Sequence, residues 1–167
     1  LRELMHTDKE GVLDRYIYEY DLLGNKTSIT KERRGLEEES GAYTYGYDAL
    51  ERLSSIHKDG IRQTRYTYDA FGNRTGKEEQ GTKTRYHYNS LNQLVSQTDQ
   101  NADGSVSREI YRYDRRGNLS QILKDGQVKN QYVYGTLNRL EKTVNAAGET
   151  AKYQYHGLGH RVGKEIT

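Results

Sequence analysis

Short segments of this chain alternate aromatic or apolar residues with polar ones, and the alternation returns at nearly regular intervals. The centre of each segment is Tyr-x-Tyr, which places two rings on the same face of an extended chain. Tyrosine suits a pleated, half-buried surface, so each segment predicts a β-strand. The seven segments are Tyr18–Tyr20, Tyr45–Tyr47, Tyr66–Tyr68, Tyr86–Tyr88, Tyr111–Tyr113, Tyr132–Tyr134 and Tyr153–Tyr155, and Tyr16 and Tyr43 extend two of them.

The spacing of these segments predicts a repeat array. The second tyrosines follow one another at steps of 27, 21, 20, 25, 21 and 21 residues, and a near-fixed period in this range is typical of repeat architectures. We therefore predict one array over residues 1–167, with about seven repeats of 20–27 residues and no separate domain. The segment Leu1–Leu4 matches Leu50–Leu53, so we expect the array to begin and end within a repeat, as a piece of a longer protein.

The residues after each second tyrosine predict a turn. The first is Asp in most copies, and an Asp side chain can bond the backbone two residues further on. The third is apolar in six of the seven copies, and the fourth is Gly or Asn in six, residues that tolerate a positive φ. The exceptions are Arg116 and Glu51. The turn residues assigned to the motif are Asp21, Gly24, Asp48, Asp69, Gly72, Asp114 and Gly117.

A second strand is predicted to run back from each turn. Its apolar residues are Leu53–Ile56, Leu94–Val95, Leu119–Leu123 and Leu140–Val144, and it ends at a second turn marked by glycine. These second turns are Ser40-Gly41, Asp59-Gly60, Gln80-Gly81, Asp103-Gly104, Asp125-Gly126 and Ala147-Gly148. The closest candidate for a helix, Arg33–Ser40, is too short. We predict an all-β fold in which antiparallel hairpins form a curved, twisted sheet.

Composition limits the core and the partners. Only 32% of the residues are hydrophobic, many of them tyrosine, so no large aliphatic core is expected. The net charge of +2 lacks the basic excess of a nucleic-acid-binding protein, and no nucleic-acid partner is expected. No apolar run approaches the length of a membrane span. Without cysteine, neither disulfides nor thiolate metal sites can form.

The pattern Tyr-x-Tyr-Asp-x-x-Gly-Asn/Arg resembles the YD repeat of the Rhs/YD-repeat family over essentially the whole chain. Asn89, Gly135 and His156 depart from it by replacing the Asp. The resemblance implies β-hairpins that spiral into a hollow shell, as in Rhs polymorphic toxins, insecticidal toxin complexes, bacterial wall-associated proteins and teneurins. In the toxin members the shell encloses a C-terminal toxin domain. The family's closing motif contains proline, which this chain lacks, so the resemblance is to the wall of the shell.

One segment offers a candidate metal site. Asp99, Asn101 and Asp103 lie in Asp-Gln-Asn-Ala-Asp-Gly, the opening of a calcium loop in which alternating oxygen ligands surround the cation. The bidentate Glu of such a loop should stand at position 110, which is Ile110. The competing interpretation is a longer hairpin turn with Asp-Gly at its tip. No other cofactor is predicted.

No constellation in the sequence predicts an enzyme. His156 and His160 are four residues apart, but the two glycines between them favour a turn over a helical metal pair. Asp21, Asp48, Asp69 and Asp114 recur at one repeat position, whereas acid–base catalysis needs a distinct pair in a pocket. We expect these carboxylates to be structural, and we assign no catalytic residue.

Two functions remain. The first is a non-catalytic structural module, part of a shell that encapsulates or displays a toxin or another domain of a large secreted or cell-surface bacterial protein. The alternative is a carbohydrate- or protein-binding module that uses the tyrosines as a stacking surface. Tyrosines screened by neighbouring hairpins would favour the first, and exposed coplanar rings the second. We also expect self-association through exposed sheet edges.

Overall fold

The structure, a computed structural model, describes residues 1–167 and confirms the all-β fold. It contains fifteen strands and one 3₁₀ helix, and no helix is long and apolar enough to cross a bilayer. The strands are β1 (Glu3–Asp8), β2 (Gly11–Tyr20), β3 (Lys26–Arg33), β4 (Gly41–Tyr47), β5 (Leu53–Lys58), β6 (Ile61–Tyr68), β7 (Arg74–Glu79), β8 (Thr82–Tyr88), β9 (Leu94–Gln100), β10 (Val106–Tyr113), β11 (Leu119–Lys124), β12 (Gln127–Tyr134), β13 (Leu140–Asn145), β14 (Thr150–Tyr155) and β15 (Arg161–Ile166).

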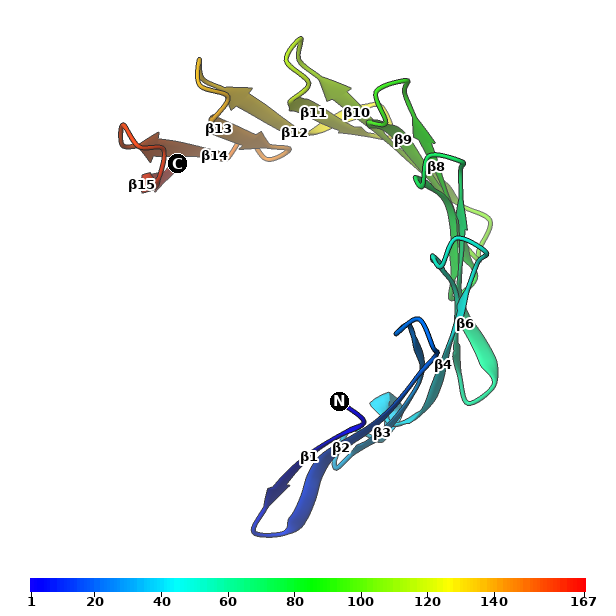
Figure 1. The fold of residues 1–167 in the computed structure, drawn as a ribbon. Helices are drawn as coiled ribbons and strands as arrows, with labels where there is room; N and C mark the ends of the chain where they lie inside the picture. The colour runs from blue at the N-terminus through cyan, green and yellow to red at the C-terminus, as the bar shows by residue number, and fades with distance from the viewer. The chain divides into compact units, whose positions relative to one another are not determined.

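The chain divides into two compact units, Leu1–Lys83 and Thr84–Thr167. In the first unit each strand from β1 to β7 pairs antiparallel with the next one in sequence (Figure 1). In the second unit β9 to β15 pair in the same way. Strand β8 begins at Thr82, just before the boundary between the units. Each unit is therefore the predicted meander of hairpins.

The predicted return strands begin where the sequence places them. Strands β5, β9, β11 and β13 begin at Leu53, Leu94, Leu119 and Leu140. Each continues past its apolar residues, because the hydrogen bonds of a strand ladder are made by the backbone and need no apolar side chain. Polar residues therefore extend the strands beyond the predicted ends.

A β-bulge, which the sequence did not predict, recurs in these hairpins. The register shifts just before the second tyrosine, as between Gly46 and Tyr47, so that Tyr47 pairs with Leu53, the first residue of β5. The same shift occurs at Tyr20, Tyr68, Tyr113, Tyr134 and Tyr155. Because a bulge bends its strand and increases the local twist, it contributes to the twisting of the sheet within each unit.

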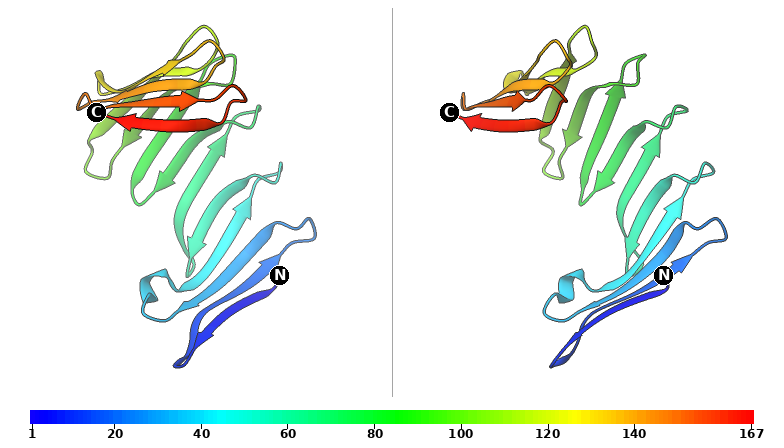
Figure 2. Two further views of the ribbon diagram at one scale, coloured as in Figure 1. Left: turned by 90° about the vertical axis from the view of Figure 1, so that its left-hand side faces the viewer. Right: turned by 60° about the vertical axis from the view of Figure 1, so that its left-hand side comes forward.

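Each unit is a single layer of strands, and no second layer packs on either face (Figure 2). The core is accordingly small: Ile29 and Leu123 are the buried hydrophobic residues, and the buried polar residues are Thr64, Thr84 and Ser96. Every tyrosine is half-buried except Tyr20, which is exposed. The tyrosines therefore supply much of the packing that an aliphatic core supplies elsewhere.

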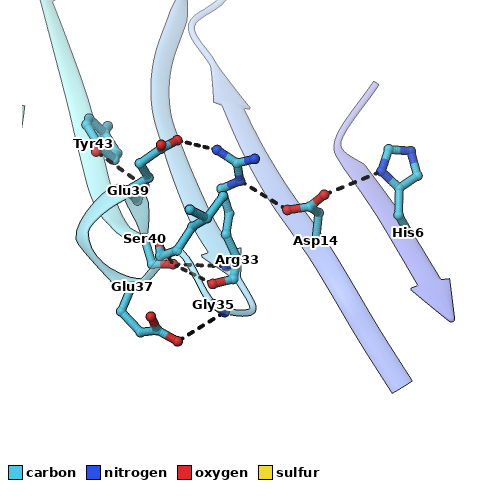
Figure 3. A network of polar contacts seen from close by, with 9 residues as sticks. His6, Asp14, Arg33, Gly35, Glu37, Glu39, Ser40 and Tyr43 are labelled. Atoms are coloured by element: carbon cyan, nitrogen blue, oxygen red, sulfur yellow. Dashed lines mark hydrogen bonds and ion pairs between the residues drawn. The ribbon is translucent and has the colours of Figure 1, made fainter. Parts of the chain in front are cut away.

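The longest connection differs from its prediction. We expected the chain to reverse at Ser40-Gly41, but β4 already begins at Gly41, and residues 34–40 make the reversal. They include the 3₁₀ helix Glu37–Glu39. The side chain of Arg33 binds Glu39 and, through Nε, Asp14 at 3.1 Å (Figure 3). The backbone N–H of Arg33 donates to Ser40 Oγ at 2.9 Å, so polar contacts stabilise this loop together with Gly35, whose φ is 75°.

Candidate functional site

The repeated feature of both units is a five-residue turn that follows each second tyrosine. In the second copy, Asp48 N–H donates to the Arg52 carbonyl at 2.9 Å, and Glu51 N–H donates to the Asp48 carbonyl at 2.9 Å. The same two backbone bonds form in all seven copies. We call these segments the motif turns; they comprise residues 21–25, 48–52, 69–73, 89–93, 114–118, 135–139 and 156–160.

The Asp that opens a motif turn is bound entirely within it. Asp69 Oδ1 accepts the N–H groups of Phe71 and Asn73, both at 2.9 Å, and Oδ2 accepts Asn73 Nδ2 at 3.0 Å. Asp21, Asp48 and Asp114 are bound in the same way, and the side-chain oxygen of Asn89 accepts the two equivalent N–H groups. In this arrangement the side chain holds the backbone of its own turn.

These hydrogen bonds favour the ionised carboxylates. The side chain of Asn73 lowers the pKa of Asp69, those of Asn25 and Asn118 lower the pKa values of Asp21 and Asp114, and the Arg52 N–H lowers that of Asp48. A general acid at neutral pH requires the opposite shift. The four carboxylates are therefore suited to hold turns rather than to transfer protons.

Two copies have neither Asp nor Asn at the first position of the turn and differ in what replaces it. Gly135 keeps only the backbone bonds. In the last copy His156 Nδ1 accepts the Leu158 N–H at 2.9 Å, the position that an Asp oxygen takes elsewhere. The rings of His156 and His160 lie 5.0 Å apart in a tilted arrangement. His156 thus occupies the turn position that we predicted for it.

The fourth residue of every motif turn has a positive φ. The glycines and asparagines adopt this conformation readily, but Glu51, with a φ of 61°, takes it as well. A left-handed conformation is costly for a residue with a Cβ atom. The turn geometry therefore overrides the preference of Glu51.

Hydroxyl groups of four second tyrosines tie their hairpins to the preceding ones. Tyr68 donates to the Leu53 carbonyl at 2.7 Å, and Tyr47 donates to the Lys26 carbonyl at 2.7 Å. Tyr113 and Tyr155 reach Leu94 and Leu140 in the same way, each at 2.8 Å. All four acceptors are the first residues of return strands. Each of these four tyrosines therefore binds the neighbouring strand, which belongs to the preceding hairpin.

The last residue of a motif turn reaches forward to the next turn. Arg52 Nη1 donates to the Asp69 carbonyl at 2.9 Å, and Gln93 Nε2 donates to the Gly117 carbonyl at 3.1 Å. Asn118 Nδ2 reaches Asn138 Oδ1 at 2.7 Å, and Arg139 Nη1 reaches the His156 carbonyl at 3.3 Å. We did not assign these residues, although the sequence has a hydrogen-bonding side chain at this position in every copy.

The tyrosine rings make two kinds of contact. The stacked pairs, Tyr16–Tyr18 and Tyr18–Tyr20, lie along strand β2. Cations also approach the rings, as in the 4.6 Å between the Arg52 guanidinium and the Tyr68 ring. Further such contacts join Lys31 to Tyr43, Arg74 to Tyr66, Arg139 to Tyr155 and Arg161 to Tyr153.

The candidate calcium residues belong to one hairpin but bind different partners. Asp99 lies in β9, where Oδ1 accepts Thr84 Oγ1 at 2.6 Å. Asp103 Oδ1 accepts both the N–H and the hydroxyl of Ser105. The backbone bonds of residues 101–105 are those of a motif turn, from Asn101 N–H to the Ser105 carbonyl and from Gly104 N–H to the Asn101 carbonyl. No group of three or more His, Asp or Glu residues has the geometry of a metal site.

Comparison with known proteins identifies a matching family. The family model described as teneurin YD-shell matches residues 3–165. The tRNA3(Ser)-specific nuclease WapA of Bacillus spizizenii is 34% identical over 141 residues, which are 81% of this chain and 6% of that protein. Human teneurin-1 is 31% identical over 149 residues, 86% of this chain and 5% of its own length. The chain thus spans about a twentieth of these relatives.

Solved structures show the same fold. The Tc holotoxin pore of Photorhabdus luminescens matches 92% of this chain with a TM-score of 0.68, at 18% sequence identity. The match covers 9% of that protein's chain. At this identity the likeness concerns the fold, and it agrees with the hairpin meander found in each unit.

Proposed function

The chain belongs to the teneurin YD-shell family, and from this premise we propose that it forms part of the wall of a β-shell that encapsulates or displays another domain. The module itself is structural. Four tyrosine hydroxyls bind backbone carbonyls of the preceding hairpin, and the last residues of four motif turns bind the next turn. This pair of contacts between successive hairpins is the observation that carries the proposal, because it builds a wall from a single layer of strands.

We further propose that the enclosed or displayed domain is a toxin and that the parent is a large secreted or cell-surface bacterial protein. Relatives named as tRNA nucleases support this, because the chain matches only 6% of their length and leaves room for a separate catalytic domain in them. The partners of the module would then be the remaining repeats of the shell and the C-terminal toxin domain. In this proposal no residue of the module has a catalytic role.

Limited proteolysis of the full-length parent protein tests this function. We expect the domain that follows the array to resist protease while the wall is intact, and to be cut faster when Tyr68→Ala and Asp69→Ala together weaken the wall. Arg65→Ala, at an exposed position of the same strand, is the matched control. A domain that is cut equally fast in the wild-type protein and in the variant would contradict encapsulation.

A binding role for carbohydrate or protein rests on one different observation. Tyr153 and Tyr155 border an open groove of about 540 Å³, whose other lining residues include Arg139, Lys152 and Glu165. Half-exposed rings beside charged groups are suited to sugars. Binding on a glycan array that is lost in Tyr153→Ala, with strand pairing unchanged by circular dichroism, would favour this second function.

A further inference from the structure

The third residues of the motif turns form an exposed row in each unit. In the first unit these residues are Leu23, Leu50 and Phe71, with 66–82% of their surface exposed, and Leu22 is fully exposed beside Leu23. In the second unit they are Leu91, Arg116, Leu137 and Leu158. Soluble domains seldom expose large apolar residues in such regular order without a partner.

The spacing of the row restricts the partner. Consecutive motif turns are two strands apart, so the apolar side chains recur every ~9.6 Å, twice the separation of neighbouring strands. A surface that fills the gaps between them must have the same period. A second array of β-hairpins has that period, whereas a helix, with its 5.4 Å pitch, does not.

Charge then selects a register. Glu51 is exposed beside Leu50 in the middle turn of the first row. The second row contains Arg116 where the other copies have an apolar residue, and Arg116 is exposed while its Nη1 binds the Gly135 carbonyl at 2.9 Å. If two rows meet in opposite directions, Leu50 and Glu51 face Arg116, Phe71 faces Leu91, and Leu22 and Leu23 face Leu137. The turn with Arg116, of net charge +1, then lies opposite the turn with Glu51, of net charge −1.

We propose that the turn row of the first unit binds the turn row of the second unit on another copy of this array. The leucine side chains of one row fill the gaps of the other, and Glu51 of one copy pairs with Arg116 of the other. This contact uses side chains at the turns, so it is distinct from backbone pairing at the sheet edges. It adds a lateral association to the proposed structural role and does not depend on any enclosed domain.

Charge reversal in the purified chain, followed by sedimentation equilibrium, tests the contact. Glu51→Arg alone places two arginines in contact and Arg116→Glu alone places two glutamates in contact, so each should weaken self-association about tenfold or more. An equimolar mixture of the two variants restores opposite charges at every contact and should recover wild-type association. Phe71→Ser should also weaken association. Circular dichroism and the urea midpoint of each variant report whether the fold is retained.

Three results would overturn the proposal. One is a wild-type chain that remains monomeric at high concentration. The second is a mixture that associates no better than either variant alone. The third is association that is equally strong in all variants, which would assign self-association to the unpaired edges of β1 and β15 instead.

Discussion

The hydroxyl of Tyr68 donates a 2.7 Å hydrogen bond to the carbonyl oxygen of Leu53, the first residue of strand β5. The bond crosses from one hairpin to the preceding one. Tyr68→Phe removes it and leaves the ring, so we expect a loss of about 1 kcal/mol of local stability. Tyr68→Ala also removes the half-buried ring and should cost more, roughly 2–3 kcal/mol.

Hydrogen exchange of the amides in β5 to β7 measures this local loss. Tyr20→Phe is the matched control, because Tyr20 has the same repeat position but is exposed and its hydroxyl makes no hydrogen bond. Faster exchange in Tyr68→Phe than in Tyr20→Phe is the expected result. Equal exchange in the two variants would show that the hydroxyl contributes nothing to cohesion between hairpins.

The aspartates of the motif turns should make the fold sensitive to acid. Their pKa values are lower in the folded chain than in the unfolded one, mainly through hydrogen bonds from Asn25, Asn73, Asn118 and the Arg52 N–H. A lowered pKa contributes stability above the unfolded value, near 4, and this contribution is lost as the pH falls through the folded value. Urea midpoints should therefore be constant from pH 7 to 5 and decline below pH 4.

Substitution by asparagine separates this effect from other acidic groups. Asn89 already opens a motif turn with the same two backbone contacts, so Asp69→Asn should keep the turn and reduce the acid dependence. Asp69→Ala should lower the midpoint at neutral pH as well. An acid dependence unchanged in a variant with all four aspartates replaced by asparagine would contradict the assignment.

Glu51 should be a site of easy stabilisation. Its φ of 61° costs ~1–2 kcal/mol for a residue with a Cβ atom, and glycine avoids that cost but loses more entropy on folding. We expect Glu51→Gly to raise stability by about 0.5–1 kcal/mol, measured by urea unfolding of dilute protein. Glu51→Ala is the control, because it removes the carboxylate and retains the strain. A gain in the alanine variant equal to that in the glycine variant would indicate a charge effect.

Several tyrosines should ionise at unusually high pH. Burial raises the pKa values of Tyr45, Tyr47, Tyr113 and Tyr134, and the Tyr111 pKa is raised by burial and by its bond to Glu109. Absorbance titration at 295 nm should show that part of the tyrosine signal changes only above pH 10, the ordinary tyrosine value. The raised values also mean that stability is present below pH 10 and is lost as the pH rises further. A single transition with all sixteen tyrosines near pH 10 would contradict this result.

Calcium binding by Asp99, Asn101 and Asp103 remains a proposal that calorimetry can test. Because Thr84 and Ser105 already bind the two carboxylates, we expect the hairpin-turn interpretation to hold and calcium to produce no heat. Heat from the wild type that disappears in Asp99→Ala would establish the metal site instead.

Local pattern was enough to predict most of the strands and the motif turns. The starts at Leu53 and Leu140 follow from the leucine directly after each motif turn, and the bonds of Asp69 follow from turn chemistry. The turn at Ala147-Gly148 was predicted at the right place, but it is a five-residue turn in which Asn145 Oδ1 accepts the N–H groups of Ala147 and Glu149. An Asn two residues before the expected turn is a signal that we did not use.

Contacts between hairpins were harder to predict. The acceptor of the Tyr68 hydroxyl is a backbone carbonyl, which every residue has, so no side chain in the sequence indicates which one it is. The bulge before Tyr68, which fixes the pairing of Tyr68 with Arg74, is likewise not marked by any particular residue type in the sequence. These features depend on the register of neighbouring strands, which becomes known only with the structure.

The choice of a peptide carbonyl as the tyrosine's acceptor has an evolutionary consequence. The acceptor residues are Lys26, Leu53, Leu94 and Leu140, a cation and three aliphatic residues, so the bond imposes no demand on the neighbour's side chain. A duplicated, deleted or recombined repeat can therefore join its new neighbour without a compensating mutation. Such interchangeability allows gene rearrangement to lengthen or shorten the array while its repeats diverge in sequence.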